Sequence, residues 1–106
     1  MTNEQINVAL AKWHSENDTG DVLYRFYGGT LLRITGLSPP CLLTPYTDSL
    51  DTMRLIEDLM TDEQWPTYSN AILWGGIYII PKDILLANAE RRARAAVTAL
   101  GLEGNE

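Results

Sequence analysis

Three arginines lie within four residues near the end of this 106-residue chain: Arg91, Arg92 and Arg94. The chain has 14 acidic and 8 basic side chains and a formal net charge of −6, so this run concentrates much of its positive charge. The guanidinium groups of Arg91 and Arg94, one helical turn apart, can bind a phosphate or a carboxylate through charge-assisted hydrogen bonds. The alternative interpretation is that the run forms the solvated face of an ordinary helix and offsets an acidic surface.

A second group of cations lies in residues 24–33, YRFYGGTLLR, where aromatic and basic side chains alternate around a glycine pair. Aromatic rings and guanidinium groups suit a ligand that contains a base and a phosphate, and the glycines let backbone N–H groups approach an anion. The alternative is that the aromatic residues fill the core or pair across strands. We expect the two groups to wall one partly closed pocket, which a second subunit can complete. The candidate ligand-binding residues are Tyr24, Arg25, Tyr27, Arg33, Arg91 and Arg94.

No pattern of catalytic or metal-binding residues accompanies these clusters. His14 is the only histidine, which excludes a two-histidine metal site, and we expect it to end a helix. Asp48 and Asp51 suit the start of a helix, where acidic side chains are favoured. Cys41 has no histidine nearby in the sequence that would activate it as a nucleophile. Hydrolase, P-loop and dinucleotide-binding fingerprints are also missing, so the sequence predicts a protein without enzymatic activity, metal or cofactor.

The composition is typical of a soluble globular protein, with 45% hydrophobic and 21% charged residues. A chain of this length is expected to form a single domain over residues 1–106. No apolar run approaches the ~20 residues of a membrane helix, and the first five residues lack the basic start of a signal peptide. We therefore expect a cytoplasmic protein with no membrane partner. The acidic balance argues against binding duplex nucleic acid, and a single cysteine excludes an internal disulfide.

The first half of the chain predicts a helix followed by a β-hairpin. A capping-box pattern at residues 2–5 and apolar residues at helical spacing behind it predict a helix over residues 3–14. Residues 22–27 are mostly β-branched or aromatic, and Gly28-Gly29 permits two adjacent positive φ values, which predicts a hairpin. Residues 36–45 contain three prolines and are predicted to form a connecting loop.

The second half repeats this alternation. Residues 49–60 form an amphipathic pattern with Asp48 or Ser49 as N-cap. Residues 61–64 repeat the capping box, but Pro66 is expected to restrict any helix there to a single turn. Residues 69–80, SNAILWGGIYII, are similar to the first hairpin and predict a second. A last helix is predicted between an N-cap at Asn88 and a stop at Gly101, with a core face of Ala89, Ala93, Ala96, Val97 and Leu100.

The order helix, hairpin, helix, hairpin, helix predicts an α+β fold, an antiparallel sheet of about four strands packed with three helices. We expect Trp13, Trp65 and Trp74 to fill the core. Trp74 and the isoleucines of residues 77–80 are expected to leave apolar surface uncovered. The sequence therefore predicts a homo-oligomer, most simply a two-fold dimer.

Three sequence blocks lie at the start, in the middle and near the end of the chain: MTNEQINVALAKW, YTDSLDTMRLIEDLMTDEQW and NAERRARAAVTALGL. This layout, which covers roughly half of the chain, resembles the phage ABA sandwich domain, a family of small phage and prophage proteins. The middle block departs from the family pattern, with Asp48-Ser49 where Asn-Asp is usual. The resemblance implies an α/β/α sandwich and a phage accessory protein without an established activity. The matching residues are Tyr46, Leu50, Met53, Glu63, Gln64, Trp65, Arg92, Leu100 and Gly101.

Two functions stay open at this point. The resemblance, the missing catalytic groups and the arginine and aromatic clusters together predict a phage accessory protein that sequesters a small anionic ligand. A nucleotide immune signal in the host cytoplasm is the example that we expect. The alternative is a protein–protein adaptor or inhibitor of a host or virion protein, with no small-molecule ligand.

Overall fold

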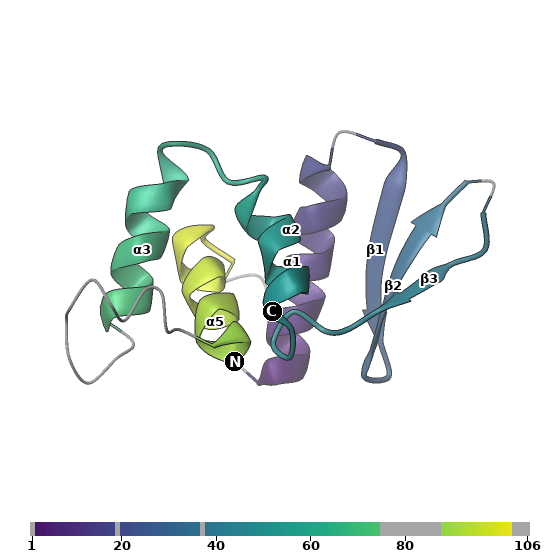
Figure 1. Ribbon diagram of the computed structural model, residues 1–106, viewed down its shortest axis with the longest axis horizontal. Helices are drawn as coiled ribbons and strands as arrows, with labels where there is room; N and C mark the ends of the chain where they lie inside the picture. The colour runs from purple at the N-terminus through teal and green to yellow at the C-terminus, as the bar shows by residue number, and fades with distance from the viewer. Residues whose placement is uncertain (1, 19, 37, 75–87, 103–106) are drawn as a thin grey trace.

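The chain forms an α+β fold with an open antiparallel sheet (Figure 1). The computed structural model describes residues 2–18, 20–36, 38–74 and 88–102. These ranges contain four helices and three strands, which confirms the predicted α+β class but corrects the predicted count of three helices and about four strands. The elements are α1 (Asn3–Asn17), β1 (Val22–Tyr27), β2 (Thr30–Thr35), β3 (Cys41–Leu43), α2 (Leu50–Glu57), α3 (Gln64–Trp74) and α5 (Ala89–Ala99).

The first hairpin forms where the sequence predicts it. β1 and β2 pair antiparallel, with Tyr24 opposite Arg33 and Tyr27 opposite Thr30. Gly28 and Gly29 make the turn at φ values of 60° and 81°, a left-handed conformation that side chains with a Cβ rarely adopt.

The predicted helix starts are also confirmed. Thr2 caps α1 through a complete capping box, in which the Gln5 side chain accepts from the Thr2 N–H at 2.8 Å. Ser49 caps α2, and the Asn88 side chain caps α5 by accepting from the Arg91 N–H at 2.9 Å. Gly101 follows α5 with a φ of 71°, as its role as a stop requires.

Two predictions for residues 61–80 were wrong. Residues 69–74 belong to α3 and not to a second hairpin. Pro66 lies in the first turn of α3, where the missing N–H of a proline removes no helical hydrogen bond, so the helix continues past it to Trp74. The remainder of the predicted second hairpin, residues 75–80, lies outside the described residues. Within the described residues the sheet has three strands and not the predicted four.

The third strand comes from the proline-rich segment predicted to be a loop. Cys41–Leu43 pairs antiparallel with β2, with Leu42 opposite Leu32. Pro39 and Pro40 immediately precede this short strand and donate nothing to its ladder. A proline pair is therefore compatible with a strand at the edge of a sheet.

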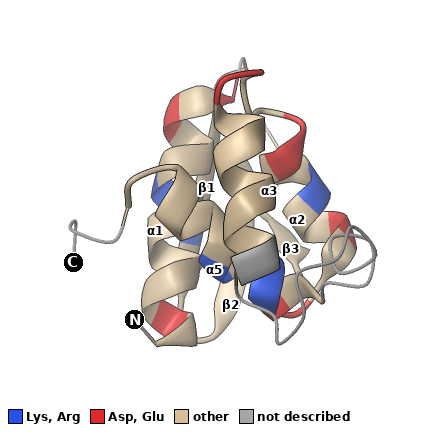
Figure 2. Ribbon diagram, turned by 90° about the vertical axis from the view of Figure 1, so that its left-hand side faces the viewer, with Lys and Arg blue, Asp and Glu red and all other residues tan. Residues whose placement is uncertain are grey.

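The described helices all lie on one side of the sheet. In Figure 1 the strands stand at one end of the molecule, α1 and α2 come next, and α5 and α3 lie farther away. α1 packs on β1, and α5 packs against both α1 and α3; Figure 2, seen from the α3 end, shows the strands behind the helices. The expected α/β/α layering is therefore not what these residues form, because the second face of the sheet carries no described helix.

The core lies among the four helices and the inner face of the sheet. α5 contributes small side chains, as predicted: Ala93 and Ala96 are fully buried and Leu100 is half-buried. Trp13 is buried, but Trp65 is 38% exposed, so its predicted place in the core was wrong. None of the helices in the described ranges has the length and apolar character that crossing a membrane requires. The largest fully buried side chains include Tyr46, Tyr68, Ile6, Leu10, Leu31, Met53, Ile56 and Ile72.

Candidate functional site

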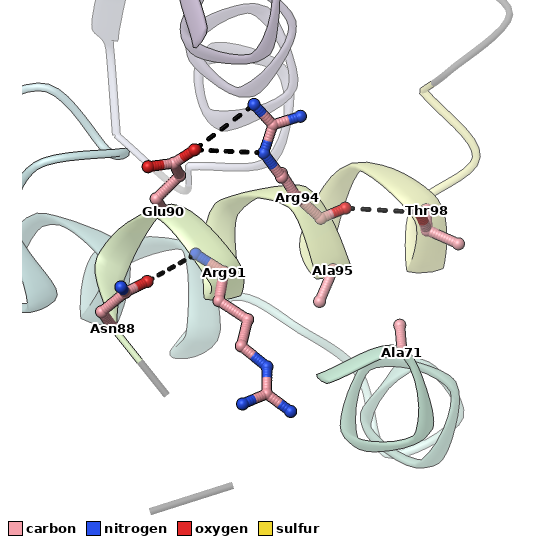
Figure 3. Close-up of a pocket in the computed structure, with 7 residues that line it drawn as sticks. All are labelled: Ala71, Asn88, Glu90, Arg91, Arg94, Ala95 and Thr98. Carbon is pink, nitrogen blue, oxygen red and sulfur yellow. Dashed lines mark hydrogen bonds and ion pairs between the residues drawn. The ribbon is translucent and has the colours of Figure 1, made fainter. Parts of the chain in front are cut away.

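A pocket of about 420 Å³ lies beside the first half of α5 and contains two of the candidate arginines. We call it the α5 pocket (Figure 3). Ala71 from α3 and Ala95 from α5 face each other across its apolar side. Its lining residues are Ala71, Asn88, Glu90, Arg91, Arg94, Ala95 and Thr98.

Arg91 is held in this pocket by the end of a neighbouring helix. Its Nε donates to the Ile72 carbonyl oxygen at 2.9 Å, and its Nη2 donates to the same oxygen. This carbonyl belongs to the last turn of α3, where backbone acceptors have no partner within the helix. A guanidinium group has five N–H donors, so one carbonyl oxygen does not exhaust the capacity of Arg91 to bind an anion.

Arg94 extends to another side of α5, beside Glu90 (Figure 3). Its Nη2 lies 3.4 Å from Glu90 Oε1 and donates to Asn3 Oδ1 at 2.9 Å. Both ionic side chains are about half exposed, at 47% and 49%, so this ion pair is well screened by water. The α5 pocket therefore has two cationic side chains and one carboxylate, and its two guanidinium groups do not converge on one point.

Arg92, the middle residue of the run, has a structural role. Its Nη1 lies 2.7 Å from Glu57 Oε2, and the Tyr68 hydroxyl donates to the same oxygen at 2.8 Å. Burial and the Glu57 carboxylate raise the pKa of Tyr68 above its usual range. Because these residues come from α5, α2 and α3, the network joins three helices inside the protein. Arg92 is therefore no part of a solvated face.

The candidate residues of the hairpin separate into two sets. Tyr24 and Arg33 face the helices and line a second pocket of about 470 Å³, which we call the hairpin pocket. Arg25 and Tyr27 alternate with Tyr24 along β1 and so point to the opposite face of the sheet. The lining residues of the hairpin pocket are His14, Asp18, Tyr24, Arg33, Leu43, Leu55, Asp58 and Leu59.

His14 forms the floor of the hairpin pocket and is only 2% exposed. Its ring stacks on Tyr24 with centroids 3.4 Å apart, and its Nδ1 lies 2.8 Å from the Tyr46 hydroxyl. Burial lowers the pKa of His14 to about 4, against the smaller opposing effect of the Asp18 carboxylate. His14 is thus neutral near pH 7 and covered by Tyr24, an arrangement that suits a core histidine.

Asp18 is positioned by two donors at the rim of the same pocket. Its carboxylate accepts from the Gly20 N–H at 3.1 Å and from the Tyr24 hydroxyl at 2.9 Å. These hydrogen bonds, with that of Gly20 the stronger influence, lower the pKa of Asp18. With Asp58 also in the lining, the hairpin pocket has two carboxylates against the single guanidinium of Arg33. It is therefore less suited to an anion than the α5 pocket.

The structure brings together some of the candidate residues and separates others. Arg91 and Arg94 share the α5 pocket, and Tyr24 and Arg33 share the hairpin pocket. α1 lies between α5 and the sheet, so the described part of one chain does not join the two clusters into one pocket.

Sequence reasoning missed the buried partners of these residues. Tyr46 is 32 positions from His14, and Glu57 is 35 positions from Arg92. One signal was present for Glu57, because it directly follows Ile56 on the apolar stripe of α2. A charged residue at the border of such a stripe needs a partner if it is buried.

Comparisons with other proteins give no independent family assignment. No protein-family model matches the chain, and no curated protein or solved structure matches it. Among the residues that the structure describes, no group of three histidine, cysteine or acidic side chains is placed to hold a metal ion.

Proposed function

We propose that this chain is a non-enzymatic binding protein for a small anionic ligand and that the ligand occupies the α5 pocket. The observation that carries the proposal is the position of Arg91, whose guanidinium is fixed in a pocket of about 420 Å³ by the Ile72 carbonyl. Pockets for small molecules typically have volumes of about 300–1,000 Å³. A side chain already held in place loses little freedom when a ligand binds to it.

The charges around the pocket favour an anion. Arg91 and Arg94 outnumber Glu90 there, although the whole chain has a net charge of −6. Arg91 also lies in the first turn of α5, where the helix dipole disfavours cations. A bound anion offsets that cost. Arg94 is half exposed, so its long side chain can turn from Glu90 toward a ligand that Arg91 holds.

The shape of the pocket favours a phosphate attached to a flat group. Ala71 and Ala95 line its apolar side with the smallest side chains available for packing (Figure 3). A nucleobase fits such a surface, and its phosphate can reach Arg91. The resemblance to phage accessory proteins supports the narrower form of the proposal, in which the ligand is a nucleotide immune signal that the protein sequesters in the host cytoplasm.

Calorimetric titration with cyclic and linear nucleotides, and with inorganic phosphate, tests this proposal. We expect Arg94→Gln to weaken nucleotide binding by about tenfold or more, because it removes a charge-assisted hydrogen bond. Glu90→Gln should tighten binding, since it removes the carboxylate that competes for Arg94. The matched controls are Arg54→Gln and Asp51→Asn, which change the same charges on α2 and should leave the affinity unchanged.

Two results would overturn the proposal. One is the absence of heat with every nucleotide and with phosphate. The other is an affinity that responds equally to the α5 variants and to their α2 controls. Recovery of the bound nucleotide after denaturation tests the non-enzymatic part, because a chemically altered nucleotide would indicate turnover.

The alternative function, a protein–protein adaptor or inhibitor, is favoured by one observation. The face of the sheet that points away from the helices exposes large apolar side chains, among them Leu42 at 73%. Exposed apolar patches on small proteins often mark interaction surfaces.

A further inference from the structure

The second face of the sheet is apolar, and no described element covers it (Figure 1). Two inward side chains of β1 and β2 are buried, with Tyr24 at 5% and Leu31 at 0% exposure. The residues between them point outward: Leu23 is 46% and Tyr27 is 80% exposed. We call this surface the outer sheet face. The pleat and the strand register assign it Leu23, Arg25, Tyr27, Thr30, Leu32, Ile34 and Leu42.

We propose that the outer sheet face binds a second copy of this chain, so that two sheets pack face to face in a two-fold dimer. The proposal is independent of the ligand proposal, because the α5 pocket lies on the other side of α1. It also assigns the interface of the predicted homo-oligomer to a different surface from the one that the sequence suggested. That prediction relied on Trp74 and residues 77–80, whose side chains lie outside what the structure describes.

The charge of the outer sheet face is the first argument for a second copy. The chain has 14 acidic side chains and a net charge of −6, so two copies repel each other over most orientations. The outer sheet face contains no acidic residue, and Arg25 is its one charged residue. Two copies therefore approach each other with the least carboxylate repulsion through this face.

The second argument is self-complementarity. A two-fold interface uses the same patch twice, so each feature must find its counterpart within that patch. Arg25 and Tyr27 supply both halves of a cation–π pair, while Leu23, Leu32 and Leu42 supply apolar surface to the facing copy. One two-fold operation thus stacks each Arg25 guanidinium on the Tyr27 ring of the second copy.

The third argument concerns the edge of the sheet, which is the competing route to self-association. The Ser15 hydroxyl accepts from the Tyr24 N–H at 2.7 Å and donates to the Tyr24 carbonyl oxygen at 3.0 Å. These backbone groups point away from β2, and an added strand would need them. Ser15 therefore blocks the middle of the β1 edge. The other edge, β3, is only three residues long and follows two prolines, so it offers few backbone groups to an added strand. The faces of the sheets are thus favoured for pairing.

The size of the outer sheet face sets the strength of the dimer. Two strands of six residues and one of three, about 4.8 Å apart and rising about 3.4 Å per residue, cover roughly 250 Å². Stable interfaces bury about 800 Å² on each partner. We therefore expect a weak dimer that dissociates on dilution, and its detection requires a concentration series.

Sedimentation equilibrium from low micromolar to millimolar protein tests the proposal. Leu42→Arg should weaken dimerisation by about tenfold or more, because it places a charge in an apolar interface without disturbing the core. The matched control is Leu50→Arg on α2, where the leucine is 49% exposed and lies outside the outer sheet face. Val8→Arg probes the competing geometry. Val8 lines the groove beside the β1 edge together with Leu23 and Arg25, so this variant should weaken a dimer paired through that edge more than Leu42→Arg does.

A cross-linking experiment tests the face-to-face geometry of the dimer independently of its dissociation constant. With Cys41→Ser and Leu42→Cys combined, a short thiol-specific bis-maleimide should cross-link the dimer through position 42, because face-packed sheets lie about 10 Å apart. Leu50→Cys in the same background should not cross-link. Urea unfolding of each variant verifies that it is folded. A monomer at every concentration would overturn the proposal and leave the face to a different protein. A dimer that is insensitive to Leu42→Arg, or more sensitive to Val8→Arg, would also overturn it.

Discussion

The hydroxyl of Ser15 fastens α1 to the free edge of β1 by binding both backbone polar groups of Tyr24. Its oxygen lies 2.7 Å from the Tyr24 nitrogen and 3.0 Å from the Tyr24 oxygen. It also lies 2.9 Å from the carbonyl oxygen of Ala11, one turn earlier in α1. A single side chain therefore satisfies an edge strand and fixes the helix on which the sheet packs.

Replacement of Ser15 by alanine should destabilise the protein by about 1–3 kcal/mol, because it leaves the partly buried N–H of Tyr24 without its acceptor. Urea unfolding measures the loss, and hydrogen exchange at the Tyr24 amide should accelerate. Glu16→Ala is the matched control, since Glu16 is an exposed neighbour in the same helix. Equal stability of the two variants would show that the edge contact contributes nothing.

The buried His14 makes stability depend on pH in a defined window. Folding lowers its pKa from 6.5 to about 4, so the unfolded chain binds the proton more readily. The contribution of neutral His14 is therefore complete above pH 6.5, decreases as the pH falls toward 4, and is absent below that value. A shift of this size corresponds to roughly 3 kcal/mol.

Urea titrations at several pH values measure this contribution. His14→Phe should remove most of the slope between pH 6.5 and 4, because His14 is the only histidine in the chain. The lowered pKa of Asp18 acts in a lower window, below its ordinary value of 3.8. An unchanged slope in the phenylalanine variant would mean that His14 does not titrate in this range.

The small-residue face of α5 allows the helix to approach α1 and α3 closely. Ala93 is fully buried there, so Ala93→Leu should overpack the contact and cost about 1–3 kcal/mol. Asn70→Leu adds the same side chain at an exposed position of α3 and should change stability little. If Ala93→Leu does not change the urea midpoint of unfolding, α5 can move to accommodate the larger side chain.

Local signals predicted the parts of the fold that depend on neighbouring residues. The capping box at Thr2 and the turn at Gly28-Gly29 use contacts within four residues, and both formed as predicted. The helix of residues 69–74 was missed because a short apolar run does not distinguish a strand from a buried helix. The position of Pro66 in the first turn, which permits that helix, depends on where the helix begins.

The candidate site was predictable only in part, for a related reason. Arg91 and Arg94 are one turn apart, and a shared pocket follows from that spacing. Their present partners do not follow from it. The Ile72 carbonyl accepts from Arg91 only because α3 ends beside α5, and Glu57 reaches Arg92 across 35 positions of the chain. Such contacts belong to the packing of whole helices, which no local pattern encodes.

The two neighbouring arginines Arg92 and Arg94 should differ sharply in their effect on stability. The Arg92 side chain is 17% exposed and pairs with Glu57, which is 9% exposed. Arg92→Gln therefore leaves a largely buried carboxylate with a weaker partner and should cost about 2–4 kcal/mol, somewhat less than the loss of a fully buried pair. Arg94→Gln breaks a half-exposed pair and should cost at most about 0.5 kcal/mol.

Urea unfolding of both variants measures the two costs. Combining Arg92→Gln with Glu57→Gln should recover part of the lost stability, because the uncompensated charge of Glu57 is then gone. Equal costs for Arg92→Gln and Arg94→Gln would contradict the structural role of Arg92 and would favour the interpretation of the arginine run as a solvated helix face.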